Sequence, residues 1–489
     1  MTLLLLAAFT VWPVAAVAVY GLLAPVAWPV RIGLATLAVA VTSTLVTLVP
    51  AGLIAYALTR VGVPGRELVW RVVRIGALIP PFIAPLALLL LVGPGGLLVP
   101  GGSLTGFGAI VVGQALAFLP AAVMLLVRAL VAIPVELEQA AEVLGARRRT
   151  AIRRVTLRLA GPDVLRAALV VLGFCLADVA GPLLLGGDHL VLATAIVGTA
   201  AEATTAARAA VTLGALAATV ALVGGTWRYA GVAATGWPAL PRLDRGAAPA
   251  ARWSLGVVVW TITAVLAAVW ALVPLGSLGH WSVLAGAAGV VALRNSVLLG
   301  LGAALAGTAL ALATAWIVER SRAWAARAVD ALARLPIAIP GVVAGVGYAL
   351  VFGGAPGLLG SALFVLIPIV ACWELPETSR VARAVLVRFD RSVEDAAVSL
   401  GATGVTTFTR IVAPALRGVT GRIFADLFAG GVLAVGTVIV LAGSGLGLGA
   451  ITMLTLAAAG AIGAACAIAT ALLALAGAAL LLGRAITAE

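Results

Sequence analysis

Residues 138–146 read Glu-Gln-Ala-Ala-Glu-Val-Leu-Gly-Ala, and residues 394–402 read Glu-Asp-Ala-Ala-Val-Ser-Leu-Gly-Ala. Gly145 and Gly401 lie 256 residues apart (401 − 145). The same shift carries other residues onto identical ones, Pro120 onto Pro376 and Arg154 onto Arg410. The chain is therefore predicted to be a duplicated unit, with one polar loop of this kind in each half.

The composition is that of a protein embedded in a lipid bilayer. Hydrophobic residues fill 63% of the 489 positions, and charged residues fill only 10%. Apolar runs of membrane-spanning length follow one another along the chain. No polar stretch is long enough to fold around a core of its own. The sequence therefore predicts an all-α polytopic membrane protein and excludes a soluble domain.

The apolar runs predict six spans in each half, or about twelve transmembrane helices in all. The first-half spans are expected near 3–24, 34–59, 76–97, 108–130, 164–186 and 209–227, and the second-half spans near 254–277, 295–318, 335–353, 361–379, 421–443 and 448–482. Residues 229–252 are rich in proline, glycine and alanine and are predicted to be a cytoplasmic linker. This places the halves at 1–228 and 253–489, as parallel pseudo-repeats, because six spans are an even number.

The arginines predict which side of the membrane each loop occupies. They cluster in loops that share one side if the spans alternate, and the positive-inside rule makes that side cytoplasmic. Both termini are then cytoplasmic. The net charge of +13 therefore does not indicate a nucleic-acid partner. Residues 3–23 resemble a cleaved signal peptide in length, but no basic residue precedes Arg31, so an uncleaved span is favoured.

Each repeated loop has the pattern of two short helices that meet at a glycine. Apolar residues recur at the spacing of one helix face before Gly145 and again after it. A glycine at this place can adopt the left-handed conformation that ends one helix and redirects the chain. The paired alanines allow a partner to approach closely, and the flanking charges offer charge-assisted contacts. The pattern therefore indicates a contact surface.

These residues resemble the EAA loop of type I binding-protein-dependent ABC importer permeases. In that family the loop docks a short coupling helix on the ATPase subunit. The resemblance places the loops near 134–162 and 390–418, here named the first and second repeated loops. It implies that ten residues contact the ATPase: Glu138, Gln139, Ala140, Ala141, Gly145, Glu394, Asp395, Ala396, Ala397 and Gly401.

The sequence departs from the family pattern at three positions. The usual glutamate is Gln139 in the first copy and Asp395 in the second, and Arg158 replaces a proline such as Pro414. The uncharged Gln139 predicts a weaker ionic contact in the first half, and thus two unequal dockings. The alternative is that each loop is only a solvated connection between spans. Two copies in register argue against that alternative.

The chain is expected to be a transport subunit without enzyme activity or a cofactor of its own. It contains no lysine, which a phosphate-binding P-loop requires. The resemblance therefore implies that ATP and Mg²⁺ bind to two partner ABC ATPase subunits or domains, and that an extracytoplasmic solute-binding protein delivers the solute. The cysteines are isolated, as are His189 and His280, so no metal site is predicted. The expected location is a bacterial cytoplasmic (inner) membrane.

The solute is harder to predict than the architecture. Residues 176–187 and 192–194, and residues 436–441 in the second half, resemble segments of fused ferric-iron and 2-aminoethylphosphonate permeases. We expect ferric iron, with 2-aminoethylphosphonate or thiamine as alternatives on the same architecture. A secondary transporter driven by ions is the rival from another class. A membrane-embedded enzyme ranks last, because no catalytic cluster is visible.

A few residues are candidates for the translocation pathway. Asp178 is a charged residue in an expected span, where burial costs about 2.5–3.5 kcal/mol and charges usually face a polar interior; the alternative is a carboxyl near the outer surface. Prolines in the third spans remove backbone donors and expose carbonyls beside a wet cavity, or only improve packing. The pathway candidates are Asp178, Pro182, Pro81, Pro85, Pro340 and Thr437. Asp426 is expected to pair with Arg422, four residues earlier.

Overall fold

The protein is helical throughout the part of the chain that the structure describes. That structure is a computed structural model, and it describes residues 1–93, 96–98, 104–224, 240, 249–321, 323–352, 362–442 and 446–487. Every regular element within these ranges is a helix or a helical turn. The prediction of an all-α membrane protein is confirmed, and most of the linker expected at 229–252 lies outside the described residues.

The first half contains helices α1 to α12, with three π-helical turns. They are α1 (Thr2–Leu6), η1 (Ala7–Val11), α2 (Trp12–Leu23), α3 (Val30–Tyr56), η2 (Ala57–Val61), α4 (Arg66–Gly76), α5 (Ile83–Val92), α6 (Phe107–Val131), α7 (Glu136–Val143), α8 (Arg148–Ala151), η3 (Ile152–Thr156), α9 (Leu157–Ala177), α10 (Ala180–Leu185), α11 (Leu192–Gly198) and α12 (Ala203–Gly224).

The second half contains helices α13 to α26. They are α13 (Pro249–Gly276), α14 (Ser282–Ala285), α15 (Ala287–Arg320), α16 (Trp324–Arg334), η5 (Leu335–Ile337), α17 (Gly341–Phe352), α18 (Ala362–Trp373), α19 (Leu375–Leu386), α20 (Arg391–Ser399), α21 (Gly404–Thr407), η7 (Phe408–Val412), α22 (Ala413–Ala415), α23 (Arg417–Val432), α24 (Ile439–Ala442), α25 (Gly449–Ala458) and α26 (Ile462–Thr487).

The duplication expected from sequence is visible in the order of the elements. A shift of 256 residues carries α8 onto α21 and the π-helical turn η3 onto η7 without any change of bounds. The same shift carries α7 onto α20 within one residue. A π-helical turn is rare and often marks a functional site, so its recurrence beside both repeated loops indicates that the loops are built alike.

The count of spans differs from the twelve expected. Eight helices among the described residues are long and apolar enough to cross a membrane. A ninth span is possible if residues 324–337 and 341–352, which are bent by 111° relative to each other, are taken together. Other expected spans are built from shorter pieces. The long stretch 448–482 is two helices, α25 and α26, and the expected span 164–186 is broken between α9 and α10.

The third span of each half is broken where the prolines lie. Pro80 and Pro81 belong to an irregular segment between α4 and α5, and Pro336 and Pro340 belong to the turn between α16 and α17. Proline removes a backbone donor and clashes with the preceding turn. Two such residues close together therefore break the helix, whereas the sequence reasoning predicted a kink. Irregular backbone at membrane depth must be covered by protein or face a wet cavity.

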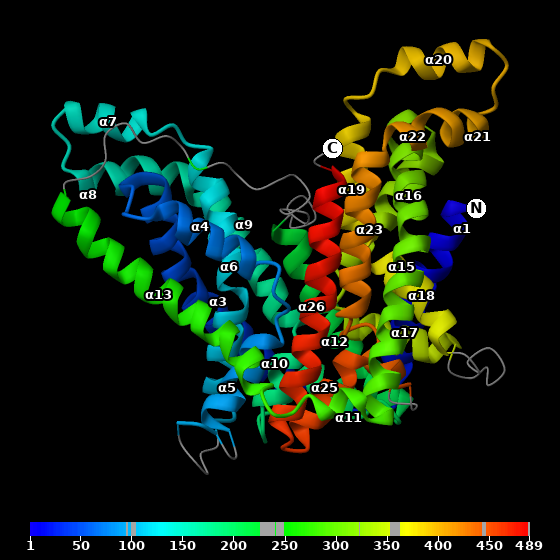
Figure 1. Cartoon of the computed structure of the whole chain (residues 1–489), viewed down its shortest axis with the longest axis horizontal. Helices are drawn as coiled ribbons and strands as arrows, with labels where there is room; N and C mark the ends of the chain where they lie inside the picture. Colours follow the sequence, from blue (N-terminus) through cyan, green and yellow to red (C-terminus); the bar gives the residue numbers. More distant parts are fainter. Residues whose placement is uncertain are drawn as a thin grey trace.

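The two halves interlock. Helix α2 of the first half packs against α17 of the second, and α13 packs against α4 and α5. The indole Nε1 of Trp260 donates a hydrogen bond of 2.9 Å to the carbonyl of Pro64 across this boundary. Figure 1 shows α13 lying along the side of the first half. A helix of each half therefore packs against helices of the other half.

Small residues bring the helices of the second half close together. A Cβ atom on Gly431 of α23 would lie 2.8 Å from the Cα of Gly300 in α15, which is too close for any side chain. Close backbone approach at glycine is the usual way in which membrane helices associate, because lipid offers no hydrophobic drive for it. This contact joins α15 to α23, the helix that follows the second repeated loop.

Candidate functional site

The two repeated loops end their first helix in the same way. Gly145 and Gly401 have φ angles of +89° and +86°, the left-handed region that glycine tolerates. The amide of Ala146 donates to the carbonyl of Ala141 at 3.0 Å, and the amide of Gly145 donates to Glu142 at 3.0 Å. The second loop repeats both bonds at the shifted positions. These are the two bonds of a Schellman motif, so the predicted role of the glycines is confirmed.

Each loop exposes apolar side chains beside its glycine. Leu144 is 88% exposed and its counterpart Leu400 is 89% exposed. Their neighbours Val143 and Val398 are exposed as well. Figure 1 shows α7 and α20 at the same end of the molecule, one over each half. Together with these neighbours, each leucine gives its loop an exposed apolar patch, and such patches mark candidate interaction surfaces.

The remaining loop residues divide into an outer and an inner set. Gln139, Ala140, Asp395 and Ala396 are exposed, and Ala141 is half-buried, whereas Ala397 is buried. Glu138 and Glu394 are buried, with 5% and 8% exposure. Six of the ten residues that the resemblance assigned to docking are therefore exposed, including Gly145 and Gly401, while the two glutamates point into the chain.

The buried glutamates form ion pairs with arginines from the second long helix of each half. The Nε of Arg60 lies 2.9 Å from Oε1 of Glu138, and Nη2 of Arg320 lies 2.7 Å from Oε1 of Glu394. A charged group away from water is normally paired in this way. Both carboxylates are satisfied within the chain, so they are not free to contact a partner.

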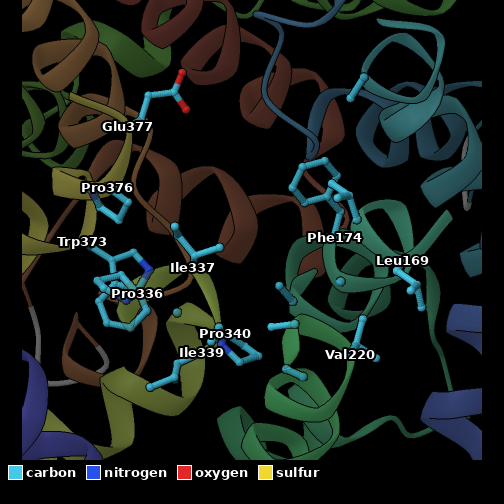
Figure 2. Close-up of a pocket in the computed structure, with 18 of the residues that line it drawn as sticks. Leu169, Phe174, Val220, Pro336, Ile337, Ile339, Pro340, Trp373, Pro376 and Glu377 are labelled. Carbon is cyan, nitrogen blue, oxygen red and sulfur yellow. The ribbon is translucent and has the colours of Figure 1, made fainter. Parts of the chain in front are cut away.

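A cavity lies between the two halves, at the level of the broken third spans. One part has a volume of about 460 Å³, and an adjoining part that shares six lining residues has a volume of about 450 Å³. Figure 2 shows Leu169, Phe174 and Val220 of the first half facing Pro336, Pro340 and Trp373 of the second half across the first part. The cavity is thus formed by both copies of the repeat.

Three carboxyl groups line this cavity, one from the first half and two from the second. Asp178 lies at the break between α9 and α10, and Glu374 lies at the break between α18 and α19. Glu377 lies about one helical turn later and lines the first part of the cavity (Figure 2). No arginine is among the described lining residues. The cavity therefore has an acidic and otherwise apolar wall.

Asp178 is held by neighbours in its own half. The side-chain Nε2 of Gln114 donates to Oδ2 of Asp178 at 3.2 Å, and the amide of Gly181 donates to Oδ1 at 3.1 Å. In the 256-residue repeat, Asp178 corresponds to Ala434 of the second half, and Glu374 corresponds to Phe118 of the first half. The acidic residues of the cavity wall are therefore not repeated between the two halves.

The other predicted pathway residues are divided between the cavity and the core. Pro81, Pro340 and Thr437 line the cavity with Asp178. Pro85 and Pro182 are buried in α5 and α10 and are not among the described lining residues. No group of three or more His, Cys, Asp or Glu residues in the described ranges is arranged to hold a metal ion.

The comparisons with known proteins agree with the loop and the helical architecture. Residues 48–233 match the model of the family described as binding-protein-dependent transport system inner membrane component. Residues 48–233 belong to this family. That range includes the first repeated loop and the helices that carry it, so the family expected from the loop pattern is confirmed.

Relatives of this family extend the match into the second half. The chain is 28% identical over 371 residues to a putative ferric transport system permease protein, FbpB 1, of Haemophilus influenzae, covering 69% of this chain and 58% of that protein. The ferric transport system permease protein FbpB of Actinobacillus pleuropneumoniae is also 28% identical, with 69% and 54% coverage. A probable sulfate transport system permease protein of Chlorella vulgaris is 31% identical over 125 residues, with 23% and 47% coverage.

The chain spans somewhat more than half the length of the ferric relatives that it matches. What these proteins transport, and what they assemble with, therefore comes to this chain only as a proposal. The match to a family of inner membrane components and the apolar helices do establish a multi-pass membrane protein.

Three features of this protein were not predicted from its sequence. Glu374 and Glu377 lie in an expected span, so the rule that intramembrane charges are functional was a signal for both. The inward direction of Glu138 had a weaker signal, since an acidic residue was present at the same position of both loops. Its partner Arg60 lies 78 residues earlier (138 − 60), and helix periodicity does not relate residues at that distance.

Proposed function

We propose that this chain is the membrane permease subunit of an ATP-driven importer that moves ferric iron, delivered by a binding protein, into the cytoplasm. The observation that carries the proposal is the pair of exposed leucines, Leu144 and Leu400, on matching loops at one end of the molecule. Two equal apolar contacts suit a partner that presents two equal grooves. That partner consists of two ABC ATPase subunits or domains.

ATP chemistry belongs to the partner in this proposal. The chain contains no lysine for a P-loop, so ATP and Mg²⁺ bind on the ATPase subunits. Arginines surround both repeated loops, and the positive-inside rule therefore puts the loops and both chain ends in the cytoplasm. The opposite face of a bacterial inner membrane receives the solute-binding protein.

The mechanism is alternating access driven through the loops. ATP binding closes the ATPase pair and draws α7 and α20 together. Because each loop is attached to the spans of its half, the halves rotate and the central cavity opens toward the binding protein. Hydrolysis reverses the motion. A partner can shift such an equilibrium only if it binds the two states with different affinity, so the loops bind the closed ATPase pair more tightly.

The cavity wall supports a cationic solute. Asp178, Glu374 and Glu377 contribute carboxyl oxygens, and the described lining residues include no arginine. Hard cations prefer oxygen ligands, whereas a sulfate or a phosphonate group would be repelled by these carboxylates. The ferric relatives point to the same substrate. 2-Aminoethylphosphonate and thiamine are the alternatives for this architecture.

The decisive experiment uses the full chain in proteoliposomes with an ABC ATPase and a solute-binding protein from the same organism. We expect uptake of radiolabelled ferric iron that requires ATP and persists when ionophores collapse all ion gradients. Uptake that stops with the gradients and needs no ATP would establish an ion-coupled secondary transporter and overturn the proposal. ATP-dependent uptake of 2-aminoethylphosphonate or thiamine in place of iron would overturn only the substrate.

A matched pair of variants tests the role of the cavity. Glu374→Gln removes a carboxylate from the wall, while Glu67→Gln makes the same change on an exposed residue of α4. We expect the first variant to lower ferric iron uptake about tenfold, equal to about 1.4 kcal/mol, and the second to leave it unchanged. Equal uptake by both would exclude Glu374 from the pathway.

A further inference from the structure

The first half holds its repeated loop through one buried arginine. Arg60 lies in η2, at the end of α3, and its side chain is 2% exposed. Its Nη2 donates hydrogen bonds to the carbonyls of Leu130 at 2.9 Å and Ile133 at 2.7 Å. The same guanidinium pairs with Glu138 of α7. One side chain thus connects the second span, the end of α6 and the first helix of the loop.

The second half holds its loop through the same set of contacts. Nη2 of Arg320 donates to the carbonyls of Leu386 and Phe389, each at 3.3 Å, and Nε donates to Glu394 at 2.7 Å. A shift of 256 residues carries Leu130 onto Leu386, Ile133 onto Phe389 and Glu138 onto Glu394. All three acceptors of the first arginine therefore recur in register.

The two arginines themselves are not in register. The shift carries Arg60 onto Trp316, and Arg320 lies four residues further along α15, which is about one helical turn. Trp316 still contacts the glutamate of the loop: its Nε1 donates a hydrogen bond of 3.1 Å to Oε2 of Glu394. The bridge is thus rebuilt from a different turn of the helix while its acceptors stay fixed. A contact inherited only with the duplicated sequence would keep the arginine in register.

From this geometry we infer that Arg60 and Arg320 are positioning residues for transport. Each clamps the docking helix of its half to the second span, so that a force applied to the exposed face of α7 or α20 moves the spans and does not merely bend the loop. Glu138 and Glu394 are the loop's attachment points, not contacts to the ATPase. The inference rests on the proposed function, since it assigns a role in transmitting the ATPase motion.

The chemistry of the clamp suits this role. A guanidinium presents several donors in a planar fork and stays charged at any physiological pH. It can therefore bind a carboxylate and two carbonyls at the same time, which an ammonium group does poorly. The first clamp is further closed by Thr156, whose hydroxyl donates to Glu138. Because Thr156 ends the π-helical turn η3, the clamp also reaches the second helical segment of the loop.

The test separates docking from transmission and does not depend on the solute. The full chain is placed in proteoliposomes, and two quantities are measured with its ATPase: the binding affinity and the stimulation of ATP hydrolysis. The variant is Glu138→Gln, which keeps the shape but removes the charge. Its matched control is Glu136→Gln, on the exposed side of the same helix.

We expect Glu138→Gln to bind the ATPase within about twofold of the unaltered chain but to lose about tenfold in stimulation, within the usual 5–150-fold range of coupling between sites. Glu136→Gln should change neither quantity. Arg60→Lys, which keeps the charge but not the fork, should fall between them. If Glu138→Gln does not accumulate in the membrane, Glu394→Gln at the more exposed second clamp provides the same comparison.

Each other outcome contradicts a specific statement. Normal stimulation by the Glu138→Gln variant would overturn the clamp, and so would a loss of affinity equal to the loss of stimulation, because a positioning residue leaves docking intact. Full activity of Arg60→Lys would overturn the role of the guanidinium fork. An unaltered chain that neither binds nor stimulates the ATPase would overturn the proposed function itself.

Discussion

The two repeated loops are alike where they face outward and different where they are supported. Leu144 and Leu400 are equally exposed, and both loops turn at a left-handed glycine. The first clamp is almost fully buried, with side-chain exposures of 2% and 7%, whereas the second is 13% and 10% exposed. The outer surface of the duplicated unit has thus been kept while its inner support has diverged.

The second half has a brace of ion pairs at positions that are mostly apolar in the first half. Arg383 of α19 pairs with Glu319 of α15 at 2.6 Å and with Asp330 of α16 at 2.8 Å. Asp330 also pairs with Arg334. A shift back by 256 residues places Val127, Val63, Arg74 and Leu78 at these positions. The brace therefore adds ion pairs between the helices that support the second loop, whereas the first loop is held mainly through Arg60. This difference predicts unequal sensitivity to mutation.

The largest effect is expected from truncating the glutamate of the first clamp. Glu138→Ala leaves Arg60 as an unpaired buried charge, which costs about 3–5 kcal/mol. Glu394→Ala should cost less, about 2 kcal/mol, because the side chain of Arg320 is 13% exposed and water can reach it more easily than it reaches Arg60. Hydrogen exchange of residues 136–143 and 391–399 measures the local opening free energy of each helix. Equal losses in the two helices would contradict the comparison.

The exposed leucines should give the next effect, and here the two halves should agree. Leu144→Ala and Leu400→Ala each remove an apolar contact, and burying a leucine stabilises by about 1.5–3 kcal/mol. We expect each variant to weaken binding of the ATPase by a similar factor, without loss of membrane accumulation. Titration of the ATPase onto proteoliposomes measures it. A large effect of one variant alone would mean that only one loop docks.

Loss of the brace of the second half should have a smaller effect by itself, but a larger one when the second clamp is also broken. Arg383→Gln breaks two partly exposed ion pairs, each contributing about 0.2–1 kcal/mol. We expect little change in ATP hydrolysis from this variant alone. Combined with Glu394→Gln, it should lower the stimulation of hydrolysis more than the two single changes predict together. Additive effects would show that the brace and the second clamp are independent.

The smallest effect concerns the start of α20. The carboxylate of Asp390 accepts a hydrogen bond of 2.9 Å from the amide of Ser392, which lowers the pKa of Asp390. The first half has Pro134 at the corresponding position and no side-chain cap on α7. Asp390→Ala should therefore speed hydrogen exchange in α20 slightly, with no change in α7.

The same cap predicts a dependence on pH. Because the folded pKa of Asp390 is lowered, its contribution is present above the ordinary aspartate value of about 3.9 and is lost as the pH falls through the lower folded value. Exchange of α20 relative to α7 should therefore rise only in strongly acidic solution. A rise near neutral pH would assign the effect to another group.

Much of the architecture was predictable because the chain is duplicated and apolar. The 256-residue shift placed both loops, both glycines and the order of the helices. The pairing of Arg422 with Asp426 is confirmed, at 3.7 Å. Eight helices of the described residues are long and apolar enough to cross a membrane, fewer than the apolar runs in the sequence, because hydrophobicity shows where a segment is buried in lipid or protein but not whether its backbone is continuous. Breaks at Asp178 and Glu374 follow from packing around the cavity.

The site was less predictable than the fold. Helix periodicity placed apolar residues on one face before Gly145, whereas the exposure of Leu144 is known only from the structure. The burial of Glu138 required knowledge that α7 folds back onto the end of α3, a tertiary contact that local pattern does not encode. The register change from Arg60 to Arg320 hid the second clamp as well, since a search for identical residues at the shift finds Trp316.

The account depends most directly on what the tips of the two loops touch. Single cysteines introduced as Leu144→Cys and Leu400→Cys, in a chain whose own three cysteines are buried, can be cross-linked in native membranes with the ATPase present. We predict that both positions cross-link to ATPase subunits, and that ATP changes the yield at both. Two positions that react only with lipid or solvent reagents, while the ATPase is present, would contradict the account.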